Sequence, residues 1–193
     1  MIPIAFLSFL SVVIYFERFF TIRIAGKENR SFIDRIRDYI HDGKIESALV
    51  LCQSTNTPYS RMIEKGVARL GRPMADILVA IENVGNMEVS KLEKGLPIIA
   101  TTAAVAPMLG FLGTVTGMVT AFFDMSNAGN ALDMGILSKG IYEALVTTVA
   151  GLIVGILALL LYNHLTSMLN SVVQKMEART MDFMDLLNEP LHT

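Results

Sequence analysis

The polar side chains best placed to do chemistry are Glu143 and the threonines of two apolar stretches, namely Thr114, Thr116, Thr120, Thr147 and Thr148. Glu143 precedes Thr147 by one helical turn and Thr148 by five residues, and Thr114 lies in the preceding apolar stretch. An ionisable residue in or beside a membrane span is costly, so it marks a functional site by default. The alternative for Glu143 is a place at the outer interface, where its side chain snorkels into water. Both interpretations stand at this point.

Threonine hydroxyls in a span also have an ordinary use, because they bond a carbonyl one turn earlier or a neighbouring helix. Taken singly, each of them is typical of helix packing. Together they lie beside two rows of small residues, which is what a narrow polar pore or a groove for a partner helix requires. His164, near the end of the second stretch, is interpreted as an interfacial polar residue rather than a proton relay.

Each of the two apolar stretches contains one row of small residues, and the packing of these rows is expected to position the polar side chains. Their members recur at spacings of three and four, and small residues at such spacing let helix backbones approach closely in lipid. Both helices are therefore predicted to lie inside a bundle. Pro97 and Pro107 each remove a backbone donor, which favours a packed or water-lined position. The packing glycines of the two rows are Gly110, Gly113, Gly117, Gly151 and Gly155.

Three membrane spans are predicted, at residues 1–22, 96–123 and 141–165. The stretch 96–123 contains no Asp, Glu, Lys or Arg, and a helix needs only about 20 apolar residues to cross a bilayer. The first stretch has neither the basic start nor the small-residue cleavage site of a signal peptide. It is short for a span, so either the chain begins inside the helix or the helix continues past Glu17 and Arg18.

The remaining segments are predicted to be helical and cytoplasmic, apart from a short periplasmic loop at 124–140. In the domain 23–95, Ser31 with Asp34 predicts one helix start and Thr57 with Pro58 another. A helix from about Met74 has no strong breaker before the second span except Gly85 and Gly95, so it is predicted to be continuous with that span. A cytoplasmic helix and tail follow at 166–193. The fold class is an all-α membrane protein with three transmembrane helices and a helical cytoplasmic domain, in which long helices extend from spans two and three into the cytoplasm.

Charge indicates the orientation and excludes several functions. Of 16 Lys and Arg residues, 13 lie between Arg18 and Lys94, and basic residues near span ends stay cytoplasmic. The N-terminus is therefore expected outside and the C-terminus inside. The basic residues are interspersed with acids, so nucleic-acid binding is not indicated. No phosphate loop, dinucleotide fingerprint, metal-ligand spacing or catalytic constellation occurs, so neither an enzyme nor a cofactor or metal site is expected. Cys52 is predicted to be a buried or bystander thiol.

Two motifs carry a resemblance to a known family. They are Ala106-Pro107 through Gly110-Phe111-Leu112-Gly113-Thr114-Val115 with Gly117-Met118, and Gly140-Ile141-Tyr142-Glu143-Ala144-Leu145 with Thr148, Gly151-Leu152 and Tyr162-Asn163. In these the chain resembles the MotA/TolQ/ExbB proton-channel family, most closely its ExbB/TolQ branch. The flagellar MotA branch has four spans and a longer cytoplasmic domain, which argues against a flagellar stator.

The resemblance implies a homopentamer in the inner membrane of a Gram-negative bacterium, whose second and third spans line a central pore. The pore would hold a single-span partner of the ExbD/TolR type, which carries the titrating carboxylate. The two pore threonines would be Thr114 and Thr148, and the pore-proximal glutamate would be Glu143. Proton passage would then energise a TonB- or TolA-like protein for outer-membrane transport or maintenance.

A second hypothesis comes from another class of protein. The chain could be a structural membrane scaffold that oligomerises through its small-residue rows and recruits partners through its cytoplasmic helices. Under this hypothesis Thr148→Val would be silent, whereas Gly113→Leu or Gly151→Leu would hold the backbones apart and disrupt assembly.

Overall fold

The computed structural model describes residues 2–27, 30–127 and 134–188, and every regular element in these ranges is a helix. The all-α prediction is confirmed. The chain divides into two compact units, and each is described by itself. Unit 1 comprises Met1–Arg18 and Gly95–Thr166, and unit 2 comprises Phe19–Lys94 and Ser167–Thr193.

Three helices are long and apolar enough to cross a membrane, as predicted: α1 (Ile2–Ala25), α6 (Leu96–Asn127) and the part of α7 (Met134–Asn188) from Leu137 onward. Their most apolar windows have mean hydropathies of 1.7, 1.8 and 2.6. Large apolar side chains on α1 lie exposed, among them Phe9, which suits a helix surrounded by lipid. The chain is therefore a multi-pass membrane protein.

The helices extend beyond several predicted limits. α1 does continue past Glu17 and Arg18, whose side chains form an ion pair at 2.5 Å. α6 runs four residues beyond the predicted span to Asn127, and α7 already begins at Met134. Helix therefore occupies both ends of the segment predicted as a periplasmic loop, and within that segment residues 128–133 lie outside the described ranges.

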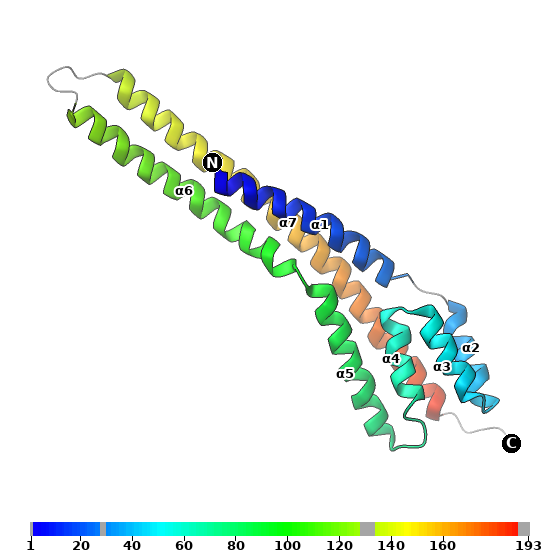
Figure 1. Ribbon diagram of the computed structural model, residues 1–193. Coiled ribbons are helices and arrows are strands. Elements are labelled where there is room, and N and C mark those ends of the chain that lie inside the picture. The colour runs from blue at the N-terminus through cyan, green and yellow to red at the C-terminus, as the bar shows by residue number, and fades with distance from the viewer. Residues whose placement is uncertain (1, 28–29, 128–133, 189–193) are drawn as a thin grey trace. The chain divides into compact units, whose positions relative to one another are not determined.

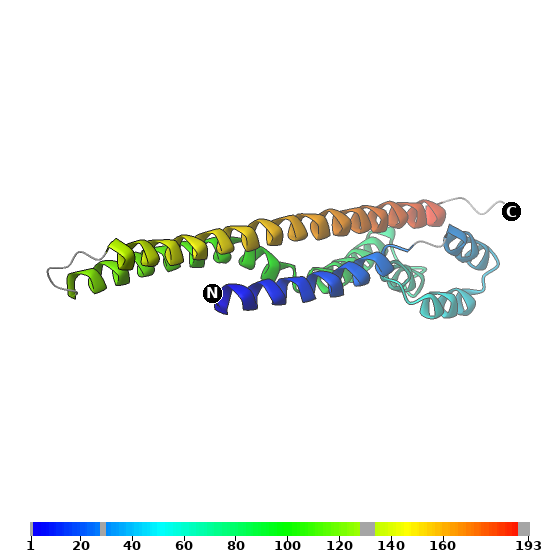
Figure 2. The ribbon, with the colours of Figure 1, turned by 90° about the horizontal axis from the view of Figure 1, so that it is seen from above.

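In unit 1, α6 and the first part of α7 run side by side in opposite directions (Figure 1, Figure 2). Glycines on both helices bring backbone against backbone. A Cβ atom on Gly151 would lie 2.6 Å from the carbonyl oxygen of Ala106 and 2.9 Å from the Cα of Gly110. A Cβ on Gly155 would lie 2.5 Å from the Pro107 ring. The two rows of small residues thus face each other within one chain.

The two prolines of α6 occupy different positions in the helix. Pro107 lies inside the helix, and its ring packs against Gly155, as expected for a residue that removes a backbone donor. Pro97 lies in the first turn, where an N–H would have no intrahelical partner in any case. Its position therefore requires no packing explanation.

Unit 2 contains α2 (Arg30–His41), α3 (Ile45–Thr55), α4 (Pro58–Val67), α5 (Met74–Glu93) and the end of α7. Thr57 caps α4 as predicted, because its hydroxyl accepts from the Ser60 N–H at 3.1 Å and the Thr57 N–H donates to Ser60 Oγ at 2.9 Å. The predicted cap at Ser31 is wrong, because this residue lies inside α2.

The prediction that α5 continues into the second span is also wrong. α5 ends at Glu93 and α6 begins at Leu96. Between them Gly95 has a φ of +90°, a left-handed conformation that glycine adopts without steric cost and other residues rarely do. Gly95 and the non-helical Lys94 before it, with φ -53° and ψ 125°, therefore separate the two helices.

The core of unit 2 is apolar and tightly packed around α4. A Cβ on Gly66 would lie 2.6 Å from the Phe183 ring and 2.8 Å from Ile81, and both of these side chains are fully buried. Cys52 is also fully buried, which confirms that prediction. Burial, with a smaller contribution from the Glu64 charge, raises the pKa of the Cys52 thiol to about 12.

One buried carboxylate completes this core. Glu88 is 4% exposed and accepts from Arg61 at 2.5 Å and from Lys91 at 2.7 Å. Burial alone would raise its pKa, but these hydrogen bonds and the two positive charges outweigh burial and hold the pKa of Glu88 below its ordinary value of 4.5. The ion pairs therefore stabilise the folded state at neutral pH.

Glu88→Gln is expected to lower the free energy of unfolding of the full chain by about 1–2 kcal/mol at pH 7, because it removes the charge from a buried site while both cations, which are partly solvated, remain. Thermal unfolding in detergent measures this loss. The difference from wild type should shrink as the pH falls below 4.5, because the unfolded carboxylate is protonated first and the folded carboxylate only at a lower pH. Glu93→Gln, at an exposed position of the same helix, is the control. Equal losses for the two variants would contradict the assignment.

Gly151→Ala is expected to cost about 1–3 kcal/mol of stability, because its new methyl group meets backbone atoms that move only if α6 and α7 separate. Gly117→Ala is the matched comparison: its Cβ would lie 3.0 Å from the Ala144 side chain, so a smaller shift relieves the contact. Thermal unfolding of the two variants should rank Gly151→Ala as the more damaging. The reverse order would show that the close approach of the backbones is not the main constraint.

Candidate functional site: a threonine cluster between α6 and α7

The close approach of the two helices gathers three hydroxyls around one backbone carbonyl. The Gly110 carbonyl oxygen lies 3.3 Å from Thr114 Oγ1, 3.4 Å from Thr147 Oγ1 and 3.1 Å from Thr148 Oγ1. Glycine at 110 is essential to this arrangement, because a Cβ there would lie 2.9 Å from the Thr147 carbonyl oxygen. Three of the four predicted site residues therefore form one cluster.

The hydroxyls also contact one another and neighbouring carbonyls. Thr114 Oγ1 and Thr148 Oγ1 form a hydrogen bond across the helix pair. The Ala144 carbonyl oxygen accepts from Thr147 at 2.7 Å and lies 3.3 Å from Thr114 Oγ1. Each hydroxyl has one proton and two acceptor positions, so its proton can point to only one of these acceptors at a time.

This arrangement suits proton movement without fixed charge. All three threonines are half-buried, in a helix pair that belongs to the membrane. A buried charge there would be costly. A hydroxyl, in contrast, can accept one hydrogen bond and donate another while it stays neutral. The cluster therefore offers alternative hydrogen-bonding patterns of similar geometry.

Glu143 does not join the cluster. Its side chain is exposed and lines an open groove of about 680 Å³ on the α6–α7 pair. Thr147 lines the same groove and also belongs to the cluster, so it connects the two places. Within the described part of the chain, the Glu143 carboxylate has no hydrogen bond or ion pair.

Two charged residues of this groove were not identified as site residues from the sequence. Asp124 from α6 and Lys139 from α7 line the groove with Glu143, but both fell in the segment predicted as a loop. The spacing of polar residues along the two helices could have identified them. Thr116, Thr120 and Asp124 are four residues apart, as are Lys139, Glu143 and Thr147, which places each set on one face of its helix.

Tyr15 and His164 form a further polar contact in unit 1. The Tyr15 hydroxyl lies 2.9 Å from His164 Nδ1 and joins α1 to α7. Neither residue contributes to the threonine cluster or to the groove that Glu143 lines. His164 thus has a helix-joining role that the sequence did not predict.

Comparison with known proteins adds independent evidence. Residues 54–178, more than half of the chain, match the MotA/TolQ/ExbB proton channel family. An ExbB-like protein 3 of Synechocystis sp., described as a putative biopolymer transport protein, is 30% identical over 169 residues, which cover 86% of this chain and 80% of that protein. A putative biopolymer transport protein ExbB homolog of Methanothermobacter thermautotrophicus is 29% identical over 80% of this chain.

The Tol-Pal system protein TolQ of Haemophilus influenzae is 39% identical over 89 residues, which cover 46% of this chain. The matches span 54% of the length of the Methanothermobacter protein and 39% of that of TolQ. The matched family segment contains the whole threonine cluster, from Gly110 to Thr148, as well as Glu143. With three membrane-spanning helices and this match, the chain belongs to the MotA/TolQ/ExbB proton channel family.

Proposed function

We propose that this chain is the pore-forming subunit of a proton-driven motor of the ExbB/TolQ type in the inner membrane of a Gram-negative bacterium. The observation that carries the proposal is the sharing of the Gly110 carbonyl by Thr114, Thr147 and Thr148. Family membership supports proton passage, and the cluster supplies neutral groups that can exchange hydrogen bonds along a path.

Three spans are too few to enclose a pathway, so several copies, in our proposal five, would surround one pore. The N-terminus would be periplasmic and the C-terminus cytoplasmic, in keeping with the basic residues between Arg18 and Lys94. A single-span partner of the ExbD/TolR type would occupy the pore and supply a titrating carboxyl group. Thr114 and Thr148 would exchange hydrogen bonds with that group, and Glu143 would provide a negative charge in the adjoining groove.

The partner's movement would energise a TonB- or TolA-like protein for outer-membrane transport or maintenance. In this role the chain converts an ion gradient into motion and is not an enzyme. The scaffold hypothesis receives less support. It requires the small-residue rows to join separate copies, but Gly110 packs on Gly151 and Gly113 on Thr147 within one chain.

Thr148→Val is expected to reduce proton uptake by about tenfold or more when the chain and its ExbD/TolR-like partner are reconstituted in liposomes under an imposed potential. Valine keeps the shape but removes a hydroxyl, and an unmade hydrogen bond in a half-buried site is worth about 1–3 kcal/mol. Thr101→Val is the matched control, because Thr101 is exposed on α6 and its hydroxyl bonds only its own helix, at Pro97.

Thermal unfolding of both variants establishes that they fold as the wild type does. Uptake that needs the partner and falls only in Thr148→Val is the predicted result. Equal uptake in wild type, Thr148→Val and Thr101→Val would contradict a role for the cluster in the proton path.

A further inference from the structure

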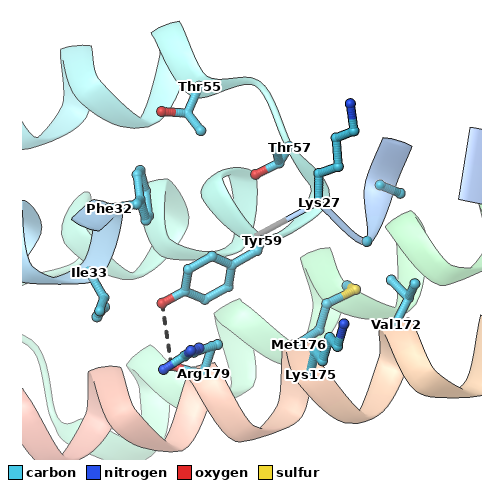
Figure 3. A pocket seen from close by; sticks show the side chains of 12 residues that line it. Lys27, Phe32, Ile33, Thr55, Thr57, Tyr59, Val172, Lys175, Met176 and Arg179 are labelled. Carbon is cyan, nitrogen blue, oxygen red and sulfur yellow. Dashed lines mark hydrogen bonds between the residues drawn. The ribbon is translucent and has the colours of Figure 1, made fainter. Parts of the chain in front are cut away.

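A small pocket in unit 2 lies where α1 ends, and the established family and proposed motor function leave it without a role. Its walls come from the last residue of α1 and the two that follow it, from α2, from the end of α3, from the start of α4 and from the last part of α7 (Figure 3). Lys27 lies at one edge, and Val172, Lys175 and Arg179 line the opposite wall. All of these residues belong to unit 2.

The inner wall of the pocket is apolar and firmly packed. The Phe32 and Tyr59 rings meet edge to face with centroids 5.6 Å apart, and Figure 3 shows the Tyr59 hydroxyl directed towards Arg179. That hydroxyl donates to the Arg179 backbone oxygen at 3.5 Å. Gly26 lies so close to Val172 that a Cβ would come within 3.0 Å of its methyl group. The chain leaving α1 is therefore held against α7 at this point.

The rim of the pocket is basic. Lys175 and Arg179 are one helical turn apart on α7, and Lys27 extends from the other edge on a flexible stem (Figure 3). Arg179 is paired with Asp182 at 2.9 Å, but neither Lys27 nor Lys175 has an ion-pair partner in the part of the chain that is described. No acidic side chain lines the pocket among those residues. Among the described residues, therefore, no ion pair neutralises the Lys27 and Lys175 charges.

Size and position narrow the choice of anion. The pocket is partly open and has a volume of about 70 Å³, far below the roughly 300–1,000 Å³ of sites for drug-sized ligands. This volume matches one phosphate-sized group better than a whole nucleotide. The pocket begins at Ala25, the last residue of a candidate membrane span, so it lies at the end of a hydrophobic helix, where lipid headgroups are found.

We propose that this pocket binds the phosphate group of an anionic phospholipid. The lysines would neutralise the headgroup, and the apolar wall beside the end of α1 would accept the start of the acyl region. Basic pockets next to membrane helices recognise anionic headgroups in this way. A soluble phosphate ester shares the charge but has no group for the apolar wall, so the lipid is the better match.

The test titrates the purified full chain in detergent with phosphatidylglycerol, phosphatidylcholine or soluble glycerol 3-phosphate, and counts bound ligand by native mass spectrometry. Phosphatidylglycerol should bind more tightly than the other two. Lys175→Gln, and separately Lys27→Gln, should weaken that binding about fivefold, the factor that one basic residue near an anionic headgroup contributes. Lys65→Gln, an equal change of charge at an exposed position outside the pocket, should leave it unchanged.

Thermal unfolding without added lipid checks that the three lysine variants are folded. Equal binding of phosphatidylglycerol and phosphatidylcholine would overturn the proposal, as would unchanged phosphatidylglycerol binding in both pocket variants. Lysine-dependent binding of glycerol 3-phosphate that matches or exceeds that of phosphatidylglycerol would overturn the lipid assignment, because it would identify a site for soluble phosphate esters. None of these outcomes depends on proton transport.

Discussion

The contact between the α6 and α7 backbones at Gly110 and Gly151 is the constraint on which the rest of the site depends. Lipid gives helices little hydrophobic reason to associate, so close packing must hold them together. A Cβ on either glycine would come within 3.2 Å of the other residue's Cα. This closeness places the Gly110 carbonyl within reach of hydroxyls on α7.

The same approach explains why the cluster is made of hydroxyls. Thr147 and Thr148 fit beside the glycines of α6 and still offer polar groups, which larger or charged side chains could not do at this spacing. Charge is kept to the open groove, where Glu143, Asp124 and Lys139 have access to solvent. Neutral hydroxyls in the packed zone, with carboxylates beside it, are the arrangement that the proposed proton path would need.

Unit 2, unlike the threonine cluster, contains a buried charge, and ion pairs compensate for its burial. Glu88 is almost fully buried, and it is tolerated because Arg61 and Lys91 both donate to it. The threonine cluster needs no such compensation, because it holds no charge. One chain therefore uses paired ions for stability in one unit and neutral hydrogen bonds for its candidate function in the other.

The membrane helices and their close packing could be predicted from the sequence, because both depend on the spacing of residue types along the chain. Small residues three and four apart indicated close helix packing, and the family resemblance selected Thr114 and Thr148 from the threonines beside them. Gly95 was identified as a possible break, but glycine is tolerated inside helices, and only the backbone conformation reveals that this one is left-handed. Asp124 and Lys139 were missed because turn-forming residues near them favoured a loop. The sequence could not predict that the Gly110 carbonyl is a shared acceptor, because every residue has a backbone carbonyl and the sequence does not show where it points.

The central claim is that Thr114 and Thr148 act as one unit on the proton path. The most direct measurement is a double-mutant cycle on partner-dependent proton uptake in liposomes, with Thr114→Val, Thr148→Val and the double variant. If the hydroxyls act as one unit, the double variant should be hardly slower than the slower single variant. Two reductions that multiply in the double variant would show that the threonines act independently, and would contradict this account.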